Sequence, residues 1–134
     1  MSSVSNINIP AFWTNELENF TRNYYELLNG EYSGINLTRI NDYEDFKNKQ
    51  IIDSVVPLFS SGLFKKQIQR SGAVLDIGFG GGFPILPLAF LCPEIKFLGV
   101  DCRAKKVKVV SEISKKLEVN NTQLFHSRIE DVLG

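Results

Sequence analysis

A short apolar segment that runs directly into a cluster of glycines limits the possible folds of this chain more than any other feature. Residues 73–77 read Ala-Val-Leu-Asp-Ile, and residues 78–84 read Gly-Phe-Gly-Gly-Gly-Phe-Pro. A compact apolar run of this kind is typical of a strand that is buried on both faces of a parallel sheet. Glycines after such a strand let the main chain turn sharply and let a ligand lie directly on the backbone. The segment therefore predicts a nucleotide-type cofactor loop.

Strand and helix patterns alternate from this segment onward. Apolar runs predict strands at 73–77, 95–100 and 122–125, and periodic apolar residues predict helices at 84–91 and 103–118. A β-α-β-α-β order indicates an α/β fold, with a doubly wound, Rossmann-like parallel sheet and right-handed crossovers. In the doubly wound pattern these strands lie in the order 3-2-1, so the first strand is expected at an edge.

The chain before Gly72 has an all-helical pattern. Apolar residues recur there at three- and four-residue steps, which predicts helices at 11–29, 43–56 and 63–69. Proline lacks a main-chain donor, so we expect Pro57 to end the second of these helices. The sequence thus predicts an N-terminal helical region, 1–71, followed by the first half of a cofactor-binding domain, 72–134.

The charges of the chain balance, with 15 Lys and Arg residues against 15 Asp and Glu residues. No global positive field attracts nucleic acid, so any RNA contact must come from a local patch. One run of cations lies in the predicted helix at 103–118 and consists of Arg103, Lys105, Lys106 and Lys108. A solvated helix face is the simplest interpretation of this run, and contact with RNA phosphates is the open alternative.

Cysteine usage and hydropathy bear on where the protein resides. Cys92 and Cys102 form no C-x-x-C or metal-ligand spacing, which favours a reducing compartment. No stretch approaches the roughly 18 apolar residues that a membrane span needs, and the N-terminus has no signal-peptide pattern. We therefore expect a cytoplasmic protein without a membrane partner and without a metal site.

The spacing of the glycines distinguishes two classes of cofactor. A dinucleotide fingerprint counted from Gly78 requires its third glycine at position 83, which is Phe83 here. This argues against an NAD-dependent oxidoreductase and favours a smaller cofactor, S-adenosyl-L-methionine. We expect Gly80 to approach that cofactor so closely that a side chain there would collide with it. Asp101 ends the second predicted strand, where its carboxylate could accept hydrogen bonds from the ribose hydroxyls.

The residues after the third predicted strand offer a further part of this site. Ile129 could cover the adenine face while nearby polar groups, among them Glu130, meet the adenine edge. The lone histidine, His126, is more simply a bystander than a base, and no neighbour of Cys102 in the sequence would activate its thiol. These patterns identify no catalytic residue.

Several short motifs, taken together, resemble one family. In chain order they are Asn36-Leu37-Thr38, Ile51-Ile52-Asp53-Ser54, the loop 76–84 with Leu86-Pro87-Leu88 behind it, Asp101, Lys105-Lys106 and Ser127-Arg128-Ile129-Glu130-Asp131. This combination resembles the ribosomal RNA small subunit methyltransferase G family, once called glucose-inhibited division protein B. The resemblance implies an S-adenosylmethionine-dependent enzyme that methylates N7 of a guanine in 16S ribosomal RNA. It also implies cofactor contacts at Gly78, Phe83, Ile129 and Glu130.

The sequence departs from the family pattern at three places. Gln50 stands where the family usually has a histidine, and Ile85 follows Pro84 where the family often has glycine. The family also continues through a fourth strand with a serine-arginine pair, whereas this sequence ends at Gly134. We therefore expect a partner chain, as in a homo-oligomer, or rearranged termini to cover the open sheet edge, and we expect little or no methyl transfer by this chain alone. The alternative hypothesis is a fragment that binds cofactor or RNA without turnover.

Overall fold

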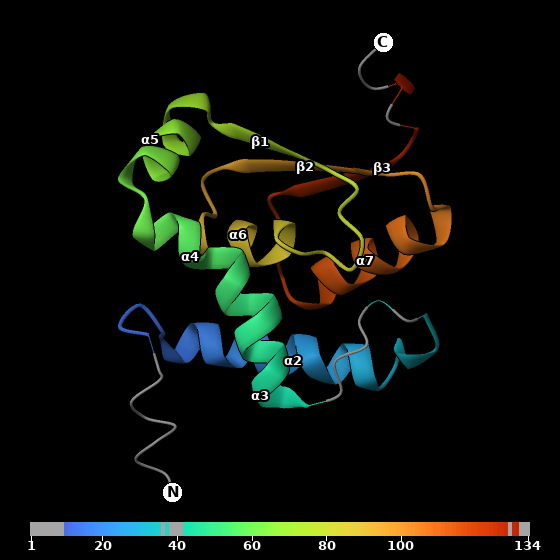
Figure 1. Ribbon diagram of the computed structural model, residues 1–134. Helices are drawn as coiled ribbons and strands as arrows, with labels where there is room; N and C mark the ends of the chain where they lie inside the picture. Colours follow the sequence, from blue (N-terminus) through green and yellow to red (C-terminus); the bar gives the residue numbers. More distant parts are fainter. Residues whose placement is uncertain (1–9, 36, 38–41, 129, 132–134) are drawn as a thin grey trace, which may run out of the picture.

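The computed structural model describes residues 10–35, 37, 42–128 and 130–131, and these form three layers (Figure 1). The first layer is a sheet of strands β1 (Ala73–Ile77), β2 (Lys96–Asp101) and β3 (Thr122–His126). Helices α6 (Ile85–Leu91) and α7 (Ala104–Lys116) lie against one face of this sheet. Helices α2 (Asn15–Asn29) and α3 (Tyr43–Phe46) lie beneath them, whereas α5 (Gly62–Ser71) lies beside β1.

The strands are all parallel and lie in the order β1-β2-β3, which places β1 at an edge as the sequence predicted. The predicted α/β fold, a parallel Rossmann-like sheet with crossover helices, is confirmed. Because the strands are parallel, the carboxyl ends of β1, β2 and β3 lie at the same end of the sheet. The glycine loop that follows β1 therefore lies beside the residues that follow β2.

The register of the sheet sorts its side chains onto two faces. Ile77, Val100 and Phe125 are partners across the three strands and share one face. Leu75 lies on the same face, and it is 48% exposed, compared with 41% for Ile77 and 48% for Phe125. No helix of the described residues lies over this face (Figure 1). The opposite face carries Phe97, which is fully buried under the helices.

The N-terminal region is helical, as predicted. Its elements are α2 (Asn15–Asn29), the 3-10 helix η1 (Ser33–Ile35), α3 (Tyr43–Phe46), the π-helix η2 (Lys47–Ile52), α4 (Asp53–Ser60) and α5 (Gly62–Ser71). Helix α2 begins later than the sequence predicted because the Thr14 hydroxyl caps it and accepts a hydrogen bond from the Leu17 amide at 3.1 Å. Gly72, in the left-handed conformation at φ +70°, ends α5.

The prediction that Pro57 ends a helix was wrong, because α4 continues through Pro57 to Ser60. Proline removes one main-chain hydrogen bond from a helix interior. However, Val55 and Leu58 on either side are 0% and 6% exposed. The burial of two such side chains, each worth about 1.5 to 3 kcal/mol, offsets the lost bond.

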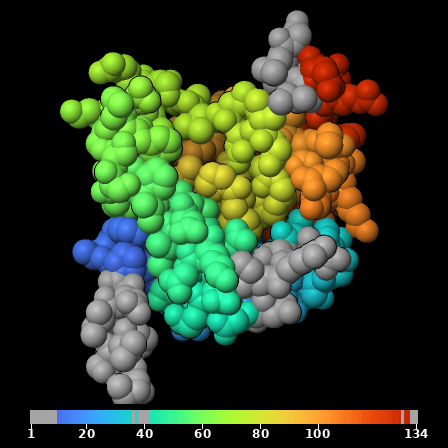
Figure 2. Space-filling model, in the orientation of Figure 1, coloured from blue at the N-terminus to red at the C-terminus, as the bar shows by residue number. Residues whose placement is uncertain are grey.

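The helical region and the sheet share one hydrophobic core. Leu17 of α2 and Ile51 of η2 are fully buried in the same cluster as Phe97 of β2. Phe20 of α2 stacks on Phe90 of α6, with ring centroids 4.3 Å apart. Figure 2 shows the lime and yellow segment of β1, its loop and α6 packed directly against the green and teal helices. The N-terminal helices are therefore part of the frame that supports the loop.

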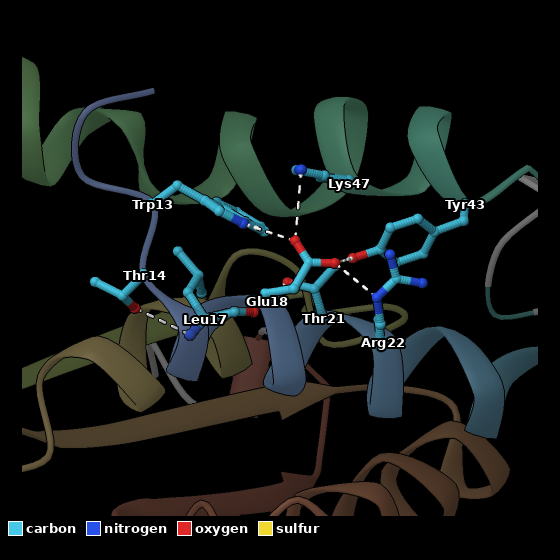
Figure 3. Close-up of polar contacts among 8 residues, drawn as sticks. All are labelled: Trp13, Thr14, Leu17, Glu18, Thr21, Arg22, Tyr43 and Lys47. Carbon is cyan, nitrogen blue, oxygen red and sulfur yellow. Dashed lines mark hydrogen bonds and ion pairs between the residues drawn. The ribbon is translucent and has the colours of Figure 1, made fainter. Parts of the chain in front are cut away.

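Glu18 of α2 connects the N-terminal helices through a polar cluster (Figure 3). Its carboxylate accepts hydrogen bonds from Trp13 Nε1 at 2.8 Å and from the Tyr43 hydroxyl at 2.5 Å. Arg22 Nε lies 2.7 Å and Lys47 Nζ 3.5 Å from the same carboxylate. Burial raises the pKa of Glu18, but the two hydrogen bonds and the two cations outweigh burial and lower the pKa below its usual 4.5. Glu18 is therefore ionised at neutral pH.

We expect Glu18→Ala to lower the free energy of unfolding at pH 7 by about 2 kcal/mol, because it removes charged hydrogen bonds and leaves the buried Lys47 ammonium without its partner. Urea denaturation measures this. Glu16→Ala, which removes an exposed carboxylate from the same helix, is the control and should change little. Because the folded-state pKa of Glu18 is depressed, its contribution is present above pH 4.5 and is lost as pH falls below that value. Equal stability of the two variants at pH 7 would contradict this account.

Candidate functional site

The loop after β1 turns through three glycines that hold left-handed backbone conformations. Gly78, Gly80 and Gly82 have φ values of +75°, +56° and +96°, a region in which side chains are strained. The Gly78 amide donates to the Val100 carbonyl at 2.6 Å and so continues the pairing of β1 with β2. The loop then turns back, with the Gly82 amide donating to the Phe79 carbonyl at 2.9 Å. The glycine cluster in the sequence thus meets a real conformational requirement.

Asp101, at the end of β2, joins this loop to the start of α7. Its buried carboxylate accepts hydrogen bonds from the Gly80 amide at 3.1 Å and the Arg103 amide at 2.9 Å. The Arg103 guanidinium adds hydrogen bonds from Nε and Nη2, both at 2.8 Å. The hydrogen bonds from the Arg103 side chain are the main reason why the pKa of Asp101 is lowered to about 2. The carboxylate is therefore ionised, and Arg103 takes up most of its accepting capacity.

Asp76, the penultimate residue of β1, is a second carboxylate at this end of the sheet. It pairs with Gly99 and so projects from the same face as Asp101. Asp76 Oδ2 is buried and has no hydrogen-bond partner within the described part of the chain. Burial, with the charge of Asp101 as a second cause, raises the pKa of Asp76 to about 6. Burying a carboxylate oxygen without a donor is unfavourable, so this position suits a cationic or hydrogen-bond-donating ligand.

Asp76 belongs to the loop motif 76–84, but the sequence patterns predicted no role for it. The available signal was its position, because Asp76 is the one charged residue in an otherwise apolar strand. Charged side chains are rarely buried unless they are paired.

A pocket of about 260 Å³ opens at the carboxyl ends of β1 and β2. Ile77 and Val100 form apolar walls, and Gly78, Asp101 and Arg103 bring main-chain and charged groups to its edge. Ligands of open parallel sheets bind at this end of the strands. Apolar walls beside a carboxylate can accommodate a flat ring that carries hydroxyl groups on one side.

The structure brings three of the predicted site residues, Gly78, Gly80 and Asp101, to this pocket or its border. The space in front of Gly80 is open with respect to the described residues, since a Cβ atom built there would meet only Arg103 Nη2 among them, at 4.0 Å. Phe83 lies elsewhere. Its ring is partly buried and stacks on Tyr24 with centroids 4.9 Å apart, so the Phe83 side chain packs toward the N-terminal helices.

The remaining candidates lie toward the end of the chain. Glu130 is exposed, and Ile129 lies outside the described residues. His126 is exposed and its Nε2 lies 3.1 Å from the Cys102 carbonyl oxygen. Across the described ranges, no group of three or more His, Cys, Asp or Glu side chains could hold a metal ion. Nor is any helix in those ranges long and apolar enough to cross a membrane.

Known proteins resemble this chain over most of its length. The sequence model of the family described as rRNA small subunit methyltransferase G matches residues 17–133. Three relatives named ribosomal RNA small subunit methyltransferase G come from Lactobacillus helveticus (strain DPC 4571), Leuconostoc citreum (strain KM20) and Streptococcus pneumoniae serotype 19F (strain G54). They are 37%, 34% and 36% identical to this chain over 110, 118 and 114 residues, respectively.

These alignments cover 81%, 87% and 85% of this chain but only 44%, 47% and 46% of the relatives. The chain therefore spans about half the length of the curated relatives it matches. The matched segment includes the glycine loop, Asp76 and Asp101. With most of the described fold inside the match, the chain belongs to the rRNA small subunit methyltransferase G family.

Proposed function

We propose that this chain binds S-adenosyl-L-methionine at the carboxyl ends of β1 and β2, as part of an enzyme that methylates N7 of a guanine in 16S ribosomal RNA. One observation carries the proposal: a loop of left-handed glycines lies beside the ionised Asp101 and the unpartnered Asp76 oxygen. Membership of an rRNA methyltransferase family supports it, because such an enzyme needs a methyl donor.

The residues present fit this cofactor at three points. The main chain at Gly78 and Gly80 lets a ligand approach closely, because neither residue has a side chain and the nearest described atom in front of Gly80 is Arg103 Nη2. The Asp101 carboxylate offers acceptors for the ribose hydroxyls once Arg103 has moved aside. Asp76 offers a negative charge for the ammonium group of the methionine part. Each point uses a group that the fold already holds in place.

The family resemblance supplies the remaining contacts of the proposed site. We propose Ile129 and Glu130 at the adenine ring and the main chain of Phe83 beside the loop. The exposed cations of α7, Lys105 and Lys108, are proposed to contact rRNA phosphates, which requires only accessible positive charge.

The chemistry of guanine N7 explains why binding groups suffice. The cofactor supplies an electrophilic methyl group on a sulfonium, and N7 carries a lone pair and no proton. No general base is therefore needed to expose the nucleophile. The protein has to hold the methyl carbon roughly 3 Å from N7 and in line with the departing sulfur, an effect worth several kcal/mol. Asp76 and Asp101 accordingly act in binding and not as bases.

A second candidate function is cofactor or RNA binding without turnover. The open sheet favours it, because β1 is an edge strand and its own residues Leu75 and Ile77 are about half exposed. We propose that another chain, such as a second copy, covers this edge. Light scattering and a methylation assay on undermethylated small subunits test both points. A monodisperse, active monomer would rule out this second candidate.

Isothermal titration should detect binding of S-adenosyl-L-homocysteine, the demethylated cofactor product, and no binding of NAD. Asp101→Asn should weaken the binding of S-adenosyl-L-homocysteine by roughly 1.5 to 3 kcal/mol, because a charge-assisted hydrogen bond to ribose becomes a neutral one. Asp53→Asn, an exposed carboxylate of α4, is the control and should bind normally. Comparable affinity for NAD would show that the proposed cofactor class is wrong.

Arg103→Ala should tighten the binding of S-adenosyl-L-homocysteine several-fold, because the ribose no longer has to displace a guanidinium from Asp101. The backbone amide at position 103 still donates to Asp101, so the carboxylate keeps part of its support. Lys105→Ala removes the same charge from an exposed position of α7 and serves as the control. Weaker binding by Arg103→Ala than by Lys105→Ala would mean that Arg103 holds the site together instead of competing for it.

The affinity for S-adenosyl-L-homocysteine should fall as pH drops below about 6, the pKa of Asp76 in the free protein. The ammonium group of this ligand favours the ionised carboxylate, so a proton on Asp76 competes with ligand binding. Asp76→Asn should remove this pH dependence, and 5′-methylthioadenosine, which lacks the ammonium group, should bind independently of pH in the same range. The folding stability of the free protein depends on pH in the opposite direction. The raised pKa makes the Asp76 contribution to stability largest below pH 3.8 and lost as pH rises through 6.

A further inference from the structure

Tyr24 of α2 reaches the glycine loop from 57 positions earlier in the chain. Its hydroxyl donates a hydrogen bond to the Gly81 carbonyl at 2.5 Å. The side chain is fully buried, and its ring stacks on Phe83 at 4.9 Å and meets Phe46 edge-on at 5.7 Å. The Phe46 and Phe83 rings also lie 5.7 Å apart, so the three rings form one cluster. Packing within this aromatic cluster fixes the direction in which the hydroxyl points.

The loop is fitted closely to this hydroxyl. A Cβ atom built on Gly82 would clash with the Tyr24 hydroxyl oxygen, and one built on Gly81 would lie 2.7 Å from the Leu37 carbonyl oxygen. The main chain therefore lies against the N-terminal region without an intervening side chain. Three left-handed glycines follow one another closely in this loop, and glycine loses more conformational freedom on ordering than any other residue. Without an external contact the loop would sample several conformations.

We infer that Tyr24 is a positioning residue that holds the loop of residues 78–83 in its ligand-binding conformation before the ligand arrives. This inference rests on the proposed function for its effect on affinity. The hydroxyl satisfies a loop carbonyl that faces the protein interior, where an unmade hydrogen bond is costly. A loop that is already ordered loses less entropy when the ligand binds. Burial raises the pKa of Tyr24 well above its usual 10, so the hydroxyl stays protonated and remains a donor.

The variant Tyr24→Phe tests the inference because it removes one oxygen and keeps the ring and its stacking partners. Hydrogen exchange should become about tenfold or more faster at the amides of Gly80 and Gly82 and stay unchanged in β1. The affinity for S-adenosyl-L-homocysteine should fall about tenfold. Tyr32→Phe is the matched control, since the buried Tyr32 also donates one hydrogen bond, to Glu112 at 2.9 Å, away from the loop.

Three results would overturn the inference. The first is unchanged loop exchange in Tyr24→Phe. The second is faster exchange throughout the chain, including β1, which would show a loss of general stability only. The third is faster loop exchange with unchanged affinity in a protein that binds the ligand. If the wild-type chain does not bind S-adenosyl-L-homocysteine, the proposed function fails, and loop exchange still decides whether Tyr24 holds the loop.

Discussion

The geometry at the carboxyl end of the sheet depends on the hydrogen bonds that the Asp101 carboxylate accepts. It accepts the Gly80 amide from the loop after β1 and the Arg103 amide from the start of α7. One side chain thus ties together the chain segments that leave two neighbouring strands. Because the carboxylate is buried and ionised, these hydrogen bonds are charge-assisted and stronger than bonds between neutral groups. The left-handed glycines make the loop able to bend this way, and Asp101 selects the bend.

The opposite side of the loop meets the N-terminal helices. Tyr24 holds the Gly81 carbonyl, and its ring stacks on Phe83, the first bulky residue after the glycines. The helical region therefore supports the loop directly, in addition to completing the hydrophobic core. This also explains why the Phe83 side chain packs inward while Gly78 and Gly80, earlier in the loop, remain accessible at the ends of the strands.

Two carboxylates on the same face of the sheet have opposite pKa shifts because their surroundings differ. Asp101 receives hydrogen bonds from Arg103 and from main-chain amides, which favour its charged form. Asp76 receives no donor on Oδ2 from the described residues, so burial and the neighbouring charge raise its pKa to about 6. Among the described residues Arg103 is the counter-ion of Asp101, and none of them forms an ion pair with Asp76. A cationic ligand would complete that balance.

Local patterns were enough to predict the strands, the glycine loop and the placement of β1 at an edge, because strand and helix periods and turn residues are properties of short segments. The same reasoning failed at Pro57, where burial of Val55 and Leu58 outweighs the preference of proline to end a helix. It also gave Asp76 no role, because a missing hydrogen-bond partner is visible only when the surroundings are known.

The amino-acid sequence by itself determined the order of the elements, the backbone conformations that the glycine loop can adopt and the family to which the chain belongs. Only the tertiary structure decided that the Arg103 guanidinium donates hydrogen bonds to the Asp101 carboxylate and that the Tyr24 hydroxyl donates to the Gly81 carbonyl. The physical reason is that these contacts depend on how helices pack against the sheet and on which rotamers that packing leaves open. Spacing along the chain specifies neither.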